Sequence, residues 1–236
     1  MTITIDLNCD AGEDPGAIDS GHEESLLRLV TSVNVACGAH AGDERTMDTL
    51  ARLCARHATA FNAHPSYPDR DNFGRVPMAI DTDALLASLR EQLQRAHTSA
   101  SAHGLRVARI KPHGALYHGA ARDQRVAHAL AHAPGTPTAF VLPPTLTTRA
   151  VFEDAGHTVI CEGFTDRAYR ADGTLVPRTE AGALIDDPSV AARQALRLAR
   201  EGGVRTICVH SDTPNALAIA AAVRETLTGA GVVLAP

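Results

Sequence analysis

The sequence predicts an α/β fold in which seven parallel strands close into a barrel with helices on the outside. Three observations support this prediction: short apolar segments alternate seven times with helical patterns, one face of several segments is polar, and polar clusters follow the segments. Serial alternation of strands and helices is typical of a parallel sheet covered by helices. A chain of 236 residues is long enough for one barrel, so we expect a single domain over residues 1–236.

The seven expected strands are short runs rich in Val, Ile, Thr and Phe. In the first of them, Ile3, Ile5 and Leu7 share one face, whereas Asp6 and Asn8 lie on the other. A sheet between two helical layers should be apolar on both faces, but a barrel can hold polar side chains in its upper lumen. The repeated polar face therefore favours a barrel. The expected strands are Thr2–Asn8, Ser32–Cys37, Thr59–His64, Val107–Pro112, Thr138–Leu142, His157–Glu162 and Thr206–His210.

A helical pattern follows each expected strand, and polar or glycine residues mark several helix ends. Asp43 and Asp81 can accept hydrogen bonds from the unpaired N–H groups at the start of their helices, and Asp187 precedes a proline that suits a first turn. Gly104 can adopt the left-handed conformation that ends many helices. The expected helices are Glu23–Val30, Asp43–His57, Thr82–His103, Asp123–Ala133, Thr145–Ala155, Ser189–Glu201 and Pro214–Thr228.

Charge, hydropathy and cysteine usage exclude several classes of function. The formal net charge is −5 without long charged runs, so we expect no nucleic-acid partner. The start of the chain lacks the basic and apolar regions of a signal peptide, and the most apolar helical segment, Ala216–Val223, is too short to span a membrane. The five cysteines form no CxxC pair and are expected to be reduced and buried. We therefore expect a cytoplasmic protein without membrane contact.

Three common nucleotide-binding or catalytic motifs are missing from the sequence. No G-x-x-x-x-G-K-[ST] loop occurs, since Lys111 is the only lysine and precedes a proline. No G-x-G-x-x-G follows the first strand, and no G-x-S-x-G is present. These absences exclude a self-contained P-loop ATPase and a Rossmann dehydrogenase, and they argue against a serine α/β-hydrolase.

Acidic, imidazole and lysine side chains follow the expected strands. Because the carboxyl ends of parallel barrel strands meet at one rim, we expect these side chains to lie near one another. The one lysine stands among 21 arginines, and its compact, desolvatable ammonium suggests a chemical role for it. Acids, bases and one lysine at a single rim are typical of a hydrolytic or proton-transfer site. The residues concerned are Asp10, Glu13, His40, His64, Lys111, His113 and His210.

Five motifs occur in order along the chain: Asp6–Asn8 with Asp10 and Gly12–Glu13, Asn34–Asp43, His64–Asp69 with Phe73–Arg75, Lys111–Tyr117, and Asp166–Tyr169 with Asp172–Arg178. In sequence and spacing they resemble the LamB/YcsF lactam-utilisation family, also called the 5-oxoprolinase A-subunit family. The resemblance implies a distorted seven-stranded β/α barrel similar to glycoside hydrolases and polysaccharide deacetylases. It also implies ATP-dependent opening of 5-oxo-L-proline to L-glutamate with two partner subunits, B and C. The complex would use the ATP, which fits the missing phosphate loop.

Opening of an activated lactam needs a base for water and a fixed donor for the developing oxyanion. Asp10, Glu13 or a neutral histidine can act as the base, and Lys111 with His113 can act as the donor. Arginine can hold a substrate carboxylate or phosphate in a bidentate fork. We expect catalysis from Asp10, Glu13, His40, Lys111 and His113, and substrate binding by Asn8, Asn34, His64, Ser66, Arg75, Asp166, Arg167, Arg178, His210 and Asp212.

The chain departs from the usual family pattern in three places. Ser211 stands where the family usually has glycine, and a left-handed backbone there would cost serine about 1–2 kcal/mol. His118 replaces a usual asparagine. The segment around residues 201–206 is shorter than in most members, which we expect to affect a subunit contact or a pocket wall more than the fold.

Two other functions remain open on the sequence. One is a metal-dependent amidohydrolase or deacetylase acting on a small amide or sugar, with Asp10, His40 and His64 as ligands of zinc or another divalent ion. The other is a non-catalytic subunit that binds the lactam or stabilises its partners. His128 and His132 share a helix face, but no carboxylate lies nearby in the sequence, so we do not expect a metal there.

Overall fold

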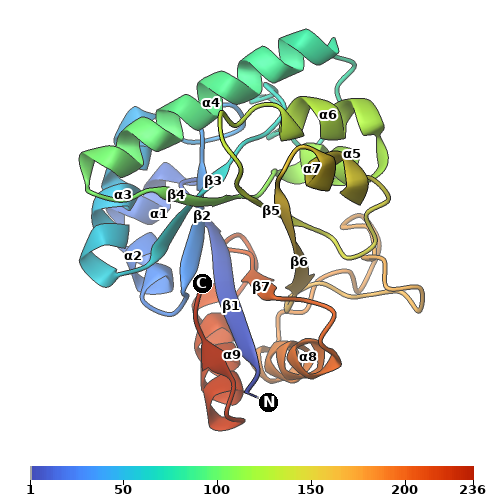
Figure 1. Ribbon diagram of the computed structural model, residues 1–236. Coiled ribbons are helices and arrows are strands. Elements are labelled where there is room, and N and C mark those ends of the chain that lie inside the picture. Colours follow the sequence, from blue (N-terminus) through green and yellow to red (C-terminus); the bar gives the residue numbers. More distant parts are fainter. Residues whose placement is uncertain (1) are drawn as a thin grey trace.

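The computed structural model describes residues 2–236 and shows a closed barrel of seven parallel strands with helices on the outside (Figure 1). The strands are β1 (Thr4–Ala11), β2 (Ser32–Ala36), β3 (Ala60–His64), β4 (Val107–Ile110), β5 (Ala139–Leu142), β6 (Thr158–Phe164) and β7 (Thr206–Val209), with β8 (Val233–Leu234) added on β1. Each strand from β1 to β7 pairs with the next, and β7 pairs with β1, which closes the barrel. The predicted fold class is confirmed.

Polar side chains fill the lumen in layers, as the alternating pattern predicted. Near the amino ends of the strands, Asp6 accepts hydrogen bonds from Ser32 (2.9 Å) and Thr206 (2.7 Å). One layer higher, Asn8 donates to Thr206 (2.7 Å) and Asn34 donates to Asn8 (2.8 Å). All five side chains are buried. Since buried polar groups cost free energy unless they are paired, this network fixes which strands stand side by side.

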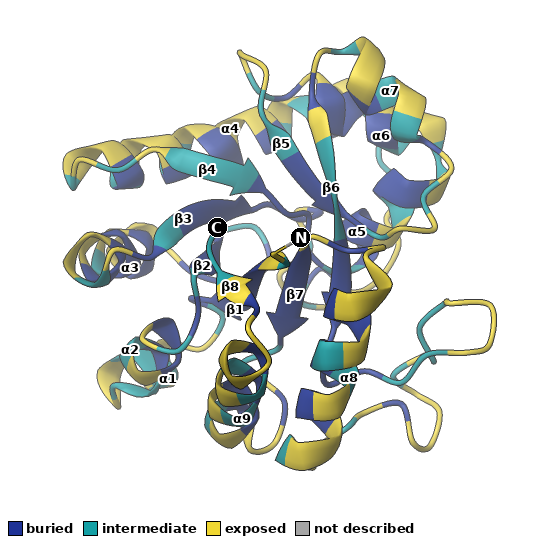
Figure 2. Ribbon diagram, turned by 60° about the horizontal axis from the view of Figure 1, so that its bottom comes forward, coloured by how far each residue is buried: buried dark blue, intermediate teal, exposed yellow. Residues whose placement is uncertain are grey.

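Nine helices lie within residues 2–236, and each of them except the first buries residues on its inner face, while the outer faces are exposed (Figure 2). Alanine and leucine supply most of the buried contacts, which compensates for the scarcity of aromatic residues. The helices are α1 (Pro15–Asp19), α2 (His22–Leu27), α3 (Glu44–His57), α4 (Thr82–Ala102), α5 (Gly114–Arg122), α6 (Gln124–Ala131), α7 (Arg149–Asp154), α8 (Pro188–Glu201) and α9 (Ala216–Gly229).

The predicted helix ends are confirmed where a capping residue marked them. Asp43 accepts a hydrogen bond from the Thr46 N–H (2.8 Å), and Asp81 accepts one from the Asp83 N–H (2.9 Å). Asp187 caps α8 in the same way, directly before its proline. Gly104, after α4, has a left-handed backbone with φ of 72°.

Two helices and the last strand were not predicted. α1 has only five residues and buries none of them, so it has no amphipathic pattern to detect. α5 begins at Gly114, directly after the Lys111-Pro112-His113 motif, and Asp123 separates it from α6. The two-residue β8 is too short to show a strand period.

The barrel is distorted on the side of β4. This strand ends at Ile110 rather than at the expected Pro112, because a proline has no N–H to donate to a neighbouring strand. The pairing of β3 with β4 contains a register shift between Phe61 and Ala63, and β4 meets β5 at a single pair, Ile110 and Phe140. The distortion implied by the family resemblance is therefore present.

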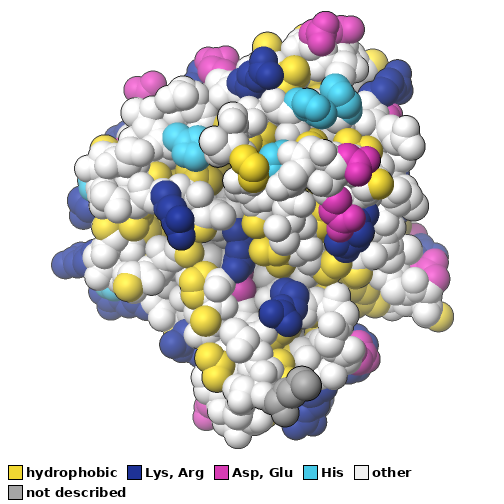
Figure 3. All heavy atoms as spheres, viewed as in Figure 1, with side chains coloured by type: hydrophobic (Ala, Val, Ile, Leu, Met, Phe, Trp, Pro, Cys, Tyr) yellow, Lys and Arg dark blue, Asp and Glu magenta, His cyan; other side chains and the backbone are white. Residues whose placement is uncertain are grey.

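The hydropathy of the helices, the charges on the surface and the state of the cysteines can now be described. Within residues 2–236, no helix combines the length and apolar character needed to cross a membrane. On the face shown in Figure 3, basic and acidic side chains are interspersed with uncharged surface. All five cysteines are free, and four of them are buried, whereas Cys161 is partly exposed.

Candidate active site

A cavity of about 560 Å³ opens at the carboxyl ends of the strands, and we call it the rim cavity. Loops that follow β1, β3, β4, β6 and β7 supply its polar walls, as expected for a β/α barrel. The structure thus brings together most of the predicted residues. Those that line the rim cavity are Asp10, Glu13, His64, Arg75, Lys111, His113, Arg167, Arg178 and His210.

Lys111 joins two carboxylates at the floor of the rim cavity. Its Nζ atom lies 2.9 Å from Asp10 Oδ1 and 3.0 Å from Glu162 Oε1, and the lysine is only 3% exposed. Burial alone would lower the pKa of Lys111, but Asp10, Cys208 and Glu162 raise it well above its ordinary value. The ammonium group is therefore charged.

These contacts change the role that we assign to Lys111. An ammonium group has three N–H bonds, and Asp10, Glu162 and the Cys208 Sγ atom at 3.1 Å already surround it. In this arrangement none of its N–H bonds points to a substrate oxyanion. Lys111 instead holds Asp10 in place and keeps it ionised.

Asp10 is the carboxylate that faces the cavity from the end of β1. Its Oδ1 atom accepts hydrogen bonds from Lys111 and from Asn34 Nδ2 (2.9 Å), and its Oδ2 atom lies 3.6 Å from His64 Nε2. Burial alone would raise the pKa of Asp10, but the Lys111 ammonium group brings it well below its ordinary value. Asp10 is therefore an ionised group with one oxygen directed at the histidines.

Three predicted substrate-binding residues lie beneath the cavity wall rather than on it. Asn8 and Asn34 are buried and bonded to each other, with Asn34 donating to Asp10. Ser66 is also buried, and its hydroxyl donates to the Tyr67 carbonyl (2.8 Å). The asparagines position the carboxylate above them.

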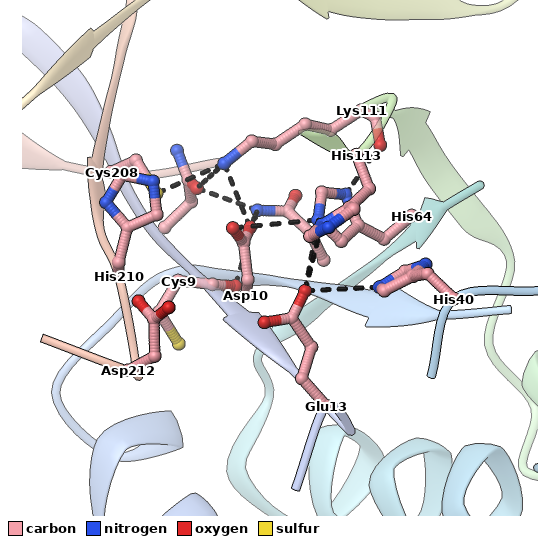
Figure 4. Close-up of polar contacts among 12 residues, drawn as sticks. Cys9, Asp10, Glu13, His40, His64, Lys111, His113, Cys208, His210 and Asp212 are labelled. Atoms are coloured by element: carbon pink, nitrogen blue, oxygen red, sulfur yellow. Dashed lines mark hydrogen bonds and ion pairs between the residues drawn. The ribbon is translucent and has the colours of Figure 1, made fainter. Parts of the chain in front are cut away.

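Glu13, His40, His64 and His113 form a cluster, shown in Figure 4, which we call the histidine cluster. Glu13 Oε1 lies 3.0 Å from His113 Nδ1 and 3.2 Å from His40 Nε2. His64 Nε2 lies 3.1 Å from His113 Nδ1. Burial lowers the pKa of His64 to about 3, so its ring is neutral near pH 7.

A pair of tight loops fixes the orientation of His113. Phe73 has a left-handed backbone with φ of 54°, and its carbonyl accepts a hydrogen bond from His113 Nε2 (2.9 Å). Such a conformation costs a residue other than glycine about 1–2 kcal/mol. Gly114 must be glycine, since a Cβ atom there would lie 2.6 Å from the Gly74 carbonyl oxygen.

His210 and Asp166 form a second polar pair at the cavity. His210 Nδ1 lies 2.9 Å from Asp166 Oδ1, and the buried carboxylate also accepts a hydrogen bond from Thr213 Oγ1 (2.6 Å). Burial would raise the pKa of Asp166, but His210 and Thr213 lower it. The ionised carboxylate can only accept, so His210 Nδ1 carries a proton and donates a hydrogen bond to it. In the neutral ring, the lone pair of Nε2 is then available to accept a proton.

Arginines give the cavity a positive wall. Arg75 Nη2 and Arg178 Nη1 lie 2.6 Å and 3.3 Å from Asp212 Oδ2, so this one aspartate holds both guanidinium groups. Arg167 is buried and donates to the Val176 carbonyl (2.6 Å). Two of the three arginines are thus partly exposed and able to turn toward an anionic ligand.

Glu162 and Cys208 were not among the predicted site residues, and Ser211 is less strained than expected. Glu162 is a carboxylate on an otherwise apolar strand, and that pattern could have identified it as a lumen residue. Cys208 is small and uncharged, so nothing in the sequence predicted that it contacts Lys111. Ser211 has no left-handed backbone, and replacing the usual glycine therefore costs no strain.

Comparisons with known proteins agree on one family. The model of the LamB/YcsF family matches residues 5–236. A protein of Thermus thermophilus, named as the A subunit of 5-oxoprolinase, is 42% identical over 251 residues and matches 98% of each chain. The lactam utilization protein from another strain of that species superposes with a TM-score of 0.90 at 39% identity, covering 98% of this chain and 99% of that one. The T48 deacetylase shares the fold at a TM-score of 0.51 and 15% identity, covering 99% of this chain and 87% of its own.

Proposed function

The chain belongs to the LamB/YcsF family, and we propose that it is the A subunit of an ATP-dependent 5-oxoprolinase. The proposed reaction is the hydrolytic opening of 5-oxo-L-proline to L-glutamate, coupled to ATP hydrolysis in a complex with subunits B and C. The cytoplasm supplies both ATP and a reducing environment for the five free cysteines. The observation that carries the proposal is the convergence of acidic, imidazole and guanidinium groups on one cavity in a chain of this family.

The rim cavity suits a small molecule that combines a carboxylate with a lactam. Arg75 and Arg178 stand on one wall, where a substrate carboxylate or a phosphate group can replace Asp212 as their partner. Asp10 and His210 line the same cavity. A lactam bound by its carboxylate at the arginines would therefore present its ring to the acidic and imidazole groups.

Activation of the lactam is the step that we assign to the partner subunits. An amide carbonyl is a poor electrophile, and transfer of a phosphoryl group from ATP to its oxygen would make the carbon reactive. This chain has no phosphate-binding loop motif, so ATP is expected to bind elsewhere in the complex. The rim cavity would then receive the activated lactam.

Deprotonation of water is the step that we assign to this chain. His210 is held by Asp166 in the tautomer whose Nε2 atom accepts a proton, which is the arrangement of a general base. Asp10 is ionised and lies at the same cavity, so it can orient the water or stabilise positive charge on an imidazole. Positioned general bases of this kind contribute about 10²–10⁴-fold to a rate.

Reconstitution tests this proposal directly. The purified chain is incubated with 5-oxo-L-proline and ATP, alone and with subunits B and C, and both L-glutamate and ADP are measured. We expect neither product from the chain alone and equal amounts of both from the complex. Turnover of ATP and oxoproline by the isolated chain would refute the proposed division of labour.

A further inference from the structure

Three hydrogen-bond acceptors meet at one point of the histidine cluster. His64 Nδ1 lies 2.6 Å from the Lys111 carbonyl oxygen, and His113 Nε2 lies 2.9 Å from the Phe73 carbonyl oxygen. A carbonyl oxygen can only accept, so both of these ring nitrogens carry protons. The opposite nitrogens, His64 Nε2 and His113 Nδ1, therefore direct lone pairs at each other and at the Glu13 carboxylate.

A single extra proton does not satisfy this arrangement. The distances are 3.1 Å between the two nitrogens, 3.0 Å from His113 Nδ1 to Glu13 Oε1, and 3.7 Å from His64 Nε2 to Glu13 Oε1. A proton on His113 Nδ1 can be donated to one of its two neighbours, which leaves the other acceptor facing a donor that is already used. A cation at the centre of the three atoms satisfies all of them together.

The spacing of the three atoms matches the coordination sphere of a divalent ion. Zinc lies about 2.0–2.1 Å from nitrogen and 2.0–2.2 Å from carboxylate oxygen in tetrahedral sites, so neighbouring ligand atoms stand roughly 3.3 Å apart. The three observed separations of 3.0, 3.1 and 3.7 Å lie on either side of that value. We propose that Glu13, His64 and His113 bind a divalent transition-metal ion, with zinc as the first candidate.

The remaining histidine supports the site without ligating the ion. The His40 ring is stacked on the His113 ring, with centroids 3.8 Å apart and planes inclined by 5°. A metal ion lies near the plane of each imidazole that ligates it, so two parallel stacked rings cannot both bind one ion. His40 Nε2 instead contacts Glu13 Oε1 and orients it, because a carboxylate that ligates a metal ion is usually held by a hydrogen bond of its own. Of the three ligands expected from the sequence, Asp10, His40 and His64, this assignment retains only His64.

The fourth position of the ion would face the rim cavity, because all three ligands line it. Three protein ligands and one open position are typical of catalytic rather than structural zinc sites, in which the ion lowers the pKa of bound water. Asp10 Oδ2, 3.6 Å from His64 Nε2, stands beside that position. This role in catalysis rests on the proposed function, whereas the metal site itself does not.

Metal content and cobalt absorption of the isolated chain test the site. The chain is purified without added metal or chelator and analysed by mass spectrometry, then stripped with a chelator and titrated with Co²⁺ and Zn²⁺. We expect one tightly bound equivalent, a visible absorption spectrum of tetrahedral Co²⁺, and displacement of Co²⁺ by Zn²⁺. Substoichiometric metal together with no cobalt absorption would overturn the inference.

Variants separate this site from other histidines. Glu13→Gln, His64→Asn and His113→Asn should each weaken binding more than ~100-fold, and His40→Gln should weaken it by about 10–100-fold as an orienting partner. The double variant His128→Gln/His132→Gln removes a stacked, exposed histidine pair and should bind the ion unchanged. Retained affinity in His113→Asn, or loss in the double variant, would contradict the assignment. Circular dichroism confirms that each variant is folded.

The metal inference and the proposed function fail separately. A bound ion in a complex that forms no glutamate would leave the site standing and the function refuted. Full glutamate formation by a complex assembled from the metal-free chain, in the presence of chelator, would show that the reaction does not use the ion.

Discussion

At the scale of single residues, the upper lumen depends on Lys111. It is the only lysine in the chain, and it lies between the buried carboxylates of Asp10 and Glu162. Arginine has a larger, planar head group that does not fit between two carboxylates already packed around an ammonium. The choice of lysine at this one position therefore follows from the shape of the site.

Replacing Lys111 with methionine should strongly destabilise the fold. Removal of one partner from a buried ion pair typically costs about 3–5 kcal/mol, because the remaining charge is left uncompensated. We expect Lys111→Met to lower the free energy of unfolding by that amount in urea titrations at pH 7. Adding Glu162→Gln should recover part of the loss, since it removes one of the two buried acids. A loss below about 1 kcal/mol would show that Asp10 and Glu162 do not depend on the lysine.

For single residues, the sequence predicted positions at the rim but not contacts across the lumen. His64, His113 and His210 could be placed at the rim because each follows a recognisable strand. That Lys111 contacts Asp10 rather than a substrate could not be predicted, because the contact depends on how β1 and β4 face each other across the closed lumen. The local sequence shows on which face of a helix or strand a residue lies. It does not show which residue it contacts across the lumen of a barrel.

At the scale of elements, α2 is tied to the end of β1 by a buried acid. Glu23 on α2 is 3% exposed and accepts a hydrogen bond from the Gly12 N–H (2.9 Å). Gly12 has a left-handed backbone, and the chain turns there from β1 toward Glu13. This contact therefore holds the loop that carries one member of the histidine cluster.

The acidity of Glu23 makes stability depend on pH. Burial raises the pKa of Glu23 to about 7, from an ordinary value of 4.5. Between pH 4.5 and about 7, the folded chain therefore keeps a proton on Glu23 that the unfolded chain has lost. The stabilisation that depends on this proton is complete below pH 4.5 and is lost as the pH rises through 7. The loss amounts to roughly 3 kcal/mol at about 1.4 kcal/mol per pKa unit.

Glu23→Gln should remove that dependence while keeping an acceptor for Gly12. We expect the variant to match the parent near pH 5 and to exceed its free energy of unfolding progressively toward pH 8, measured by urea titration at each pH. Glu44→Gln, which changes an exposed carboxylate in the first turn of α3, is the matched control and should follow the parent. Parallel profiles of Glu23→Gln and the parent would contradict the assignment.

At the scale of the whole molecule, the closed barrel could be predicted but its irregularities could not. The seven strands and their helices have strong local periods, and polar lumen residues such as Asp6 and Asn8 distinguished a barrel from an open sheet. The register shift near Ala63 and the left-handed Phe73 arise from packing between loops, which leaves no period in the sequence. Those loops orient His113, so the finest detail of the site was also the least predictable.

The central claim is that the rim cavity of this chain carries the hydrolytic step of the complex. Glutamate formation by the reconstituted complex containing Asp10→Asn tests it most directly, with Asp71→Asn, an exposed residue outside the cavity, as the control. Size-exclusion chromatography verifies that both variants assemble with subunits B and C. We predict that Asp10→Asn slows glutamate formation by a factor of about 100 or more, and that Asp71→Asn leaves the rate unchanged. An unchanged rate in the Asp10→Asn complex would contradict the claim.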